Sequence, residues 1–121
     1  MRICIPTAGD AGLADRLVDH FGRAPVYTIV DTETDAVDAV PNRGIHRGGD
    51  QHPPEFVADH DVDVVVVGSI GRPAVERFGA LGIEVYRGEH EPVAELVDRL
   101  RNGELDMLAP EDAHGHGHAE H

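Results

Sequence analysis

The residues with the most evident chemistry are the histidines, and one group of them lies at the C-terminal end of the sequence. This group consists of His114, His116, His118 and His121. The first three alternate with glycine, so their side chains would point the same way in an extended chain. Such a run can bind Ni, Zn, Cu or Fe ions without a folded site. The alternatives are a tail that only aids solubility or a remnant of cloning.

A second group of histidines, His20, His46 and His52, lies within the chain. His20 precedes Phe21-Gly22, where the chain turns, and imidazole is the commonest metal ligand in proteins. The alternative for His20 is a histidine that bonds the last carbonyls of a helix. His46 and His52 lie in a glycine-rich loop that could fold over a bound group or simply be solvated.

Positive charges and glycines indicate where an anion could bind. The segment Gly68-Ser69-Ile70-Gly71 follows an apolar run and precedes a helical pattern, so its N–H groups could receive an anion. Tight packing between strand and helix explains the glycines equally well. The segment lacks the features of a phosphate loop or a dinucleotide fingerprint. We nominate Gly71, Arg72 and Arg23 as cofactor contacts, together with His20.

The composition describes one acidic domain. The chain has 121 residues, 40% of them apolar, and its 23 acidic residues outnumber 10 basic ones to give a net charge of −13. Every basic residue is arginine. This charge would repel phosphate backbones, so we expect no nucleic-acid partner, and solvation in a salt-rich, halophilic cytoplasm explains the acidity. The longest apolar run, Val64–Val67, is too short for a membrane span, and no signal peptide is evident.

The single cysteine, Cys4, excludes an intramolecular disulfide and a cysteine-only metal site within one chain. It lies in an apolar strand pattern, which favours a buried, inert thiol. A homodimer could supply two copies of Cys4 or of the histidines, so the number of ligands per chain stays open.

Periodicity predicts a mixed α/β sheet of five strands flanked by helices. The expected strands span 2–6, 25–31, 36–40, 63–67 and 83–86. The expected helices span 13–21, 53–59, 73–81 and 91–100, the last ending at Asn102-Gly103. This domain occupies residues 1–104, and residues 105–121 form a His/Gly-rich tail that we expect to be disordered without a ligand.

Strand directions predict that several segments meet at one sheet edge. Right-handed crossovers make the last two strands parallel to the first, so the segments that follow them share an edge. That edge gathers His20, His46, His52, His90, Arg23 and Arg72. Ligands of open α/β sheets bind at this carboxyl edge. His60 falls at the opposite edge.

Short motifs in order along residues 2–101 carry a family resemblance. They are Ile3-Cys4-Ile5-Pro6, His20-Phe21-Gly22-Arg23-Ala24-Pro25, Val30-Asp31, Pro41-Asn42, Pro53-Pro54-Glu55-Phe56, the segment 63–71 and Gly82-Ile83-Glu84-Val85-Tyr86. Together they resemble the dinitrogenase iron–molybdenum cofactor biosynthesis family.

The resemblance implies a ribonuclease-H-like fold and a protein that carries an iron–molybdenum or iron–sulfur cluster without catalysis. It implicates His20 in cluster binding. Many relatives have a cysteine ahead of the Pro-Pro-Glu-Phe motif, where this chain has His46, Asp50 and His52. Histidine is a harder ligand than cysteine, which disfavours an iron–sulfur ligand more than metal binding itself.

We therefore expect a non-enzymatic, cytoplasmic carrier whose partners are metallocluster donor or acceptor proteins. One alternative is a regulatory or interaction module that responds to metals or anions. A ribonuclease-H-like nuclease is a weaker alternative, because the first strand has no Asp or Glu for a two-metal site.

Overall fold

The computed structural model describes residues 1–19, 21–42 and 57–109. Its strands are β1 (Arg2–Thr7), β2 (Val26–Asp31), β3 (Val37–Pro41), β4 (Val64–Val67), β5 (Glu84–Arg87) and β6 (Asp106–Met107). Within these ranges the α-helices are α2 (Arg72–Ala80) and α3 (Val93–Arg101), and the 3₁₀ turns are η1 (Gly12–Ala14) and η2 (Phe21–Arg23).

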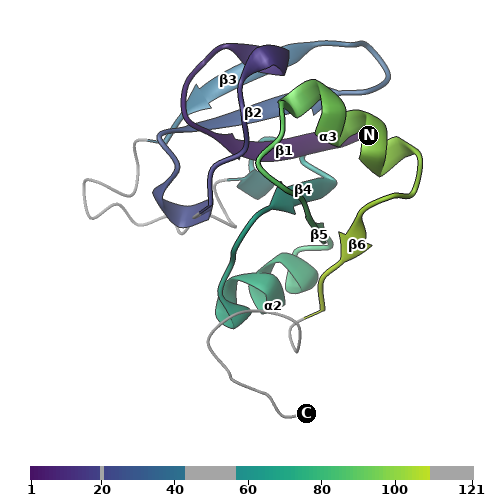
Figure 1. Cartoon of the computed structure of the whole chain (residues 1–121). Helices are drawn as coiled ribbons and strands as arrows, with labels where there is room; N and C mark the ends of the chain where they lie inside the picture. Colours follow the sequence, from purple (N-terminus) through teal and green to yellow (C-terminus); the bar gives the residue numbers. More distant parts are fainter. Residues whose placement is uncertain (20, 43–56, 110–121) are drawn as a thin grey trace.

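The strands form one mixed sheet in the order β3-β2-β1-β4-β5-β6 (Figure 1). β1, β4 and β5 run parallel to one another, whereas β2 and β6 run antiparallel to their neighbours. All four valines of β4 are buried, as a continuous apolar run at the centre of a sheet requires. The predicted mixed α/β architecture is confirmed.

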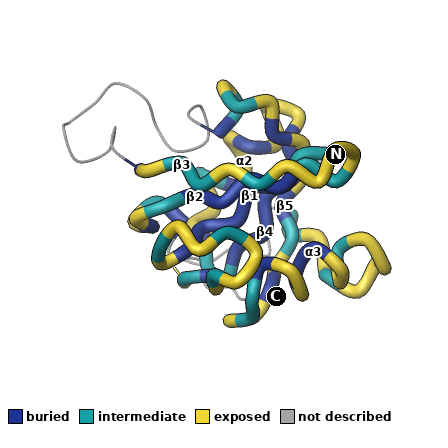
Figure 2. Tube along the Cα trace, turned by 90° about the horizontal axis from the view of Figure 1, so that it is seen from above, coloured by how far each residue is buried: buried dark blue, intermediate teal, exposed yellow. Residues whose placement is uncertain are grey.

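Alternating side chains divide the interior into two cores, one on each face of the sheet. The α2-side core includes Cys4, Val65, Val67, Val75 and Phe78. The α3-side core includes Ile3, Ile5, Val66, Val93 and Leu96. Figure 2 shows that burial concentrates in the central strands β1 and β4 and decreases toward β3. The two helices therefore cover opposite faces.

The helix predicted over residues 13–21 is wrong. The chain forms only the short turn η1 and then an extended segment whose Leu17 N–H donates to the Glu91 carbonyl at 3.3 Å. Leu17 packs in the α3-side core and Phe21 in the α2-side core. A helix would place residues four apart on the same side, so its periodicity was coincidental.

The expected number of five strands is also wrong, because β6 adds a sixth. β6 pairs with β5 through Tyr86 opposite Met107 and Arg87 opposite Asp106. Both residues of β6 are exposed, so the strand carries no apolar alternation that could reveal it. It lies in the segment that the pattern assigned to the tail, of which residues 110–121 are outside the described residues.

The remaining predictions concern helix ends. The helix expected over 53–59 lies mostly outside the described residues, and Val57 and Ala58 are helical. The predicted end of α3 is confirmed by Gly103, whose φ of 72° is the left-handed conformation that glycine favours.

No helix within residues 1–19, 21–42 and 57–109 is long and apolar enough to cross a membrane.

Candidate functional site at the carboxyl edge

The parallel strands end along one edge of the sheet, here called the carboxyl edge. β1, β4 and β5 end there at Thr7, Val67 and Arg87. His60 lies at the opposite edge, where its carbonyl accepts a hydrogen bond from Arg2 Nε at 2.9 Å. The predicted edge is confirmed for the described residues.

A crossing segment, Asp15–Asp19, passes over the carboxyl edge. Its last carbonyl, that of Asp19, accepts the Ser69 N–H at 3.0 Å just after β4. A Cβ at Gly68 would lie 2.9 Å from Leu17 Cδ2, so glycine permits this close approach. For Gly68, tight packing is therefore a sufficient explanation.

The turn that follows residue 20 is held by two buried side chains that the sequence analysis did not nominate. Asn42 Nδ2 donates to the Ala24 carbonyl at 2.8 Å, and Tyr27 Oη donates to the Phe21 carbonyl at 2.8 Å. Asn42 Nδ2 also lies 3.3 Å from Tyr27 Oη. Burial raises the pKa of Tyr27, so the phenol stays a neutral donor. The only sequence signal for Asn42 was its place in the Pro41-Asn42 motif.

The Phe21 ring fixes the same turn in the α2-side core. Its centroid is 4.9 Å from that of Tyr27 and 5.3 Å from that of Phe78, the latter in an edge-on geometry. Such aromatic pairs add to the energy of apolar burial. Residue 20 is thus flanked by Asp19, bonded to the segment after β4, and by the buried Phe21.

Comparison with known proteins identifies the family. Residues 1–103 match the sequence profile described as dinitrogenase iron–molybdenum cofactor. The chain belongs to this family. An uncharacterised protein of Methanocaldococcus jannaschii is 27% identical over 114 residues, which cover 89% of this chain and 92% of that protein.

Solved structures agree. The apo form of the orange protein from Desulfovibrio gigas superposes with a TM-score of 0.78 at 27% identity, covering 89% of this chain and 92% of that one. The NMR structure of a candidate NifB protein from Thermotoga gives 0.72 at 31% identity, covering 88% and 92%. The coarse fold and the relation to iron–molybdenum cofactor proteins are therefore established.

The nominated metal ligands of this family member all lie outside the described residues. They are His20, His46, His52, His114, His116, His118 and His121. Within the described ranges, no group of three or more His, Cys, Asp or Glu side chains is arranged to hold a metal ion. The histidine predictions stay predictions.

The nominated cofactor contacts Arg23, Gly71 and Arg72 are described, and they lie at the carboxyl edge. Arg23 is exposed on η2, while Arg72 Nε pairs with Glu76 Oε2 at 3.4 Å across one turn of α2. Gly71 is the N-cap of α2 and makes no side-chain cap. Among the described residues, a Cβ there would meet only Pro73 Cδ, at 3.7 Å.

His90 makes a contact that the sequence did not predict. Its Nε2 lies 2.5 Å from Asp19 Oδ1, and its carbonyl accepts a hydrogen bond from Arg16 Nη1 at 3.0 Å. Both contacts join the crossing segment to the loop between β5 and α3. The predicted position of His90 at the carboxyl edge is confirmed, and the histidine binds the segment that precedes residue 20.

Cys4 is fully buried in the α2-side core. Burial raises the pKa of its thiol, because the thiolate would have to be desolvated. A neutral buried thiol is a poor nucleophile and a poor metal ligand. The interpretation of Cys4 as an inert core residue agrees with this environment.

Proposed function

We propose that this family member carries an iron–molybdenum or iron–sulfur type metallocluster, or its metal ions, without catalysing a reaction. The cargo would bind at the carboxyl edge, beside residue 20. The observation that carries the proposal is the turn at Phe21–Ala24. The buried side chains of Tyr27 and Asn42 donate hydrogen bonds to its carbonyls, while Arg23 in the same turn is exposed.

The topology supports this location. From the carboxyl edge, the chain leaves β1 toward β2 on one side and leaves β4 through α2 toward β5 on the other. Ligands of open α/β sheets bind where neighbouring strands connect in opposite directions. β1 and β4 are adjacent and parallel, so the carboxyl ends of these two strands mark that point. We assign His20, the residue that follows the crossing segment in the sequence, as the first ligand of the cargo, as the family resemblance implies.

The available donors determine what kind of cargo fits. Cys4 is buried and its pKa is raised, so this chain offers no accessible thiolate. Imidazoles remain as ligands, with His20 the first and His46 and His52 supporting it. Arg23, Arg72 and the α2 N-terminus at Gly71 would meet negative charge on the cargo. The four tail histidines would capture or transfer Ni, Zn, Cu or Fe ions, and donor or acceptor proteins would be the partners.

The described residues also favour a carrier over a hydrolytic enzyme. A two-metal nuclease needs several converging carboxylates. β1 contains none, and the central strand β4 is entirely valine. We include the ribonuclease-H-like fold in this proposal, because a β3-β2-β1-β4-β5 order with only β2 antiparallel supports it; β6 is then an addition.

The test is anaerobic reconstitution of the full chain with iron, sulfide and molybdate, after purification without a nickel column. Metal content and the visible absorption spectrum are measured for the wild type, His20→Ala, a chain ending at Ala109, and His60→Ala. His60 lies at the opposite edge and serves as the matched control.

We expect cluster absorption in the wild type and in His60→Ala, and its loss in His20→Ala. The chain ending at Ala109 should keep the cluster but take up less free metal ion. A wild type that retains neither metal nor cluster would overturn the proposal, as would equal retention by His20→Ala.

A further inference from the structure

Two arginines at the carboxyl edge have no partner among the described residues, although the chain carries a net charge of −13. Arg2, Arg72 and Arg99 form ion pairs with carboxylates. By contrast, Arg23 and Arg87 are exposed, and their side chains form no hydrogen bond or ion pair within residues 1–19, 21–42 and 57–109. Arg101 also lacks a partner among the described residues, but it ends α3, away from the carboxyl edge, so Arg23 and Arg87 are distinguished by lying unpaired at this edge.

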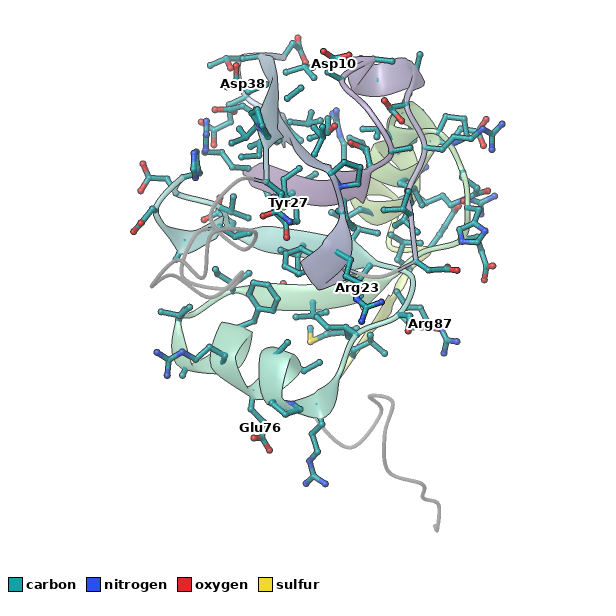
Figure 3. The ribbon with its side chains drawn as sticks, turned by 90° about the vertical axis from the view of Figure 1, so that its left-hand side faces the viewer. Asp10, Arg23, Tyr27, Asp38, Glu76 and Arg87 are labelled. Carbon is teal, nitrogen blue, oxygen red and sulfur yellow. The ribbon has the colours of Figure 1, made fainter. Side chains whose placement is uncertain are left out.

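Both arginines lie on the same face of the sheet. Arg87 ends β5 opposite Val67 and is two residues beyond Val85, and both valines belong to the α2-side core. Alternation places the Arg87 side chain on that face. Arg23 lies between Phe21 and Ala24, which belong to the same core. Figure 3 shows both labelled side chains on the side of the molecule away from Asp38.

The backbone under each arginine is fixed. Gly88, directly after Arg87, donates to the Val67 carbonyl at 2.8 Å and has no room for a side chain, since a Cβ would lie 2.8 Å from Val66 Cγ1. Arg23 lies in the turn held by Asn42. Two guanidiniums on rigid backbones lose little backbone entropy when they bind a ligand.

We propose that Arg23 and Arg87 together bind an anionic group that offers several oxygen or sulfur acceptors. The inference rests on the proposed function, because it assigns these two residues to the anionic surface of the cargo. Guanidinium forks match such acceptors through paired hydrogen bonds. Asp106 lies opposite Arg87 across β5 and β6 without forming an ion pair, so it would weaken binding without blocking it.

The test uses inorganic sulfate and citrate as separate probes of the metal-free, full-length protein at constant ionic strength. Backbone amide shifts of Arg23, Ala24, Arg87 and Gly88 report binding. The variants are Arg23→Gln, Arg87→Gln and Asp106→Asn. Arg101→Gln is the matched control, since Arg101 also lacks a partner among the described residues but ends α3, away from the carboxyl edge.

We expect saturable shifts in the wild type, roughly tenfold weaker affinity in Arg23→Gln and Arg87→Gln, and a few-fold tighter affinity in Asp106→Asn. Arg101→Gln should match the wild type. Saturation by citrate alone would assign the site to carboxylates, and by sulfate alone to tetrahedral anions. Shifts that do not saturate, or an equal loss in Arg101→Gln, would overturn the inference.

The two proposals fail separately. If neither anion binds but the wild type still retains a cluster, the arginine pair is refuted and the carrier stands. If the anions bind through both arginines but reconstitution yields no metal or cluster, the carrier is refuted and the pair is a site for free anions.

Discussion

Removing the Asn42 side chain should destabilise the fold through one turn. In Asn42→Ala, the buried Ala24 carbonyl loses the donor that lies 2.8 Å away, and the Gly22 carbonyl loses a weaker one at 3.4 Å. A buried acceptor left without a partner costs about 1–3 kcal/mol. With the small cavity added, we expect unfolding to become about 2–3 kcal/mol easier, which lowers Tm by roughly 8–12 °C for a domain of this size.

Thermal unfolding followed by circular dichroism measures this effect. Asn102→Ala is the matched control, because Asn102 is exposed at the end of α3, and its change should stay within about 0.5 kcal/mol. Asn42→Asp adds a check on the mechanism. A carboxylate there would face the Ala24 carbonyl without a proton to donate, whereas a carboxylic acid can donate.

Burial would raise the pKa of the new Asp above its value in the unfolded chain, so stability would be lost as the pH rises. Asn42→Asp should therefore be closer to the wild type at low pH than at neutral pH. The reasoning is refuted if Asn42→Ala lowers Tm no more than Asn102→Ala does.

Three further predictions concern packing, pH and thiol chemistry. Gly88→Ala should lower the free energy of unfolding by about 1–3 kcal/mol, because the new Cβ would lie 2.8 Å from Val66 Cγ1. Gly79→Ala in α2 should raise it by about 0.5–1 kcal/mol, because no described atom lies within 4 Å of the new Cβ. Equal effects of the two substitutions would contradict this prediction. Burial by itself would raise the pKa of Asp15. The backbone N–H groups that donate to its carboxylate, including those of Ala11 and Arg16, lower the pKa by more than burial raises it, so the net pKa is below the ordinary value. Its carboxylate therefore stabilises the fold above about pH 4, and this contribution is lost as the pH falls through the lowered pKa. Asp15→Asn should cost about 1 kcal/mol at pH 7 and much less under acid, and a pH-independent difference would contradict this. Cys4 should resist a thiol reagent at pH 8 in the native protein and react at once in denaturant, and rapid native labelling would show that it is accessible.

Strand positions were predictable because each strand has its own local signature. The valine run of β4 and the β-branched residues of β2 mark a central strand and a second strand without reference to the rest of the chain. The same holds for α3, whose apolar residues at Val93, Leu96 and Val97 face one core. β6 has no such signature, because both of its residues are exposed and only pairing with β5 defines it.

The sequence predicted where in the fold the candidate site lies, but not which hydrogen bonds hold its residues in position. Strand directions alone bring Arg23 and Arg72 to the carboxyl edge, since crossover connections return the chain to the opposite edge and so make β1, β4 and β5 parallel. No periodicity could indicate that Asn42 and Tyr27 hold the Phe21–Ala24 turn, because those hydrogen bonds join the turn to β2 and to the end of β3.

By itself, the sequence determined the family, the alternation of strands and helices, the excess of acid and the types of ligand on offer. These are properties of composition, short motifs and local periodicity. Only the tertiary structure decided that residues 15–19 cross the sheet edge as an extended segment instead of a helix, and that Arg23 and Arg87 share one face without a partner among the described residues. Leu17 and Phe21 pack into opposite cores, whereas a helix would place these two residues, four apart in the sequence, on the same side.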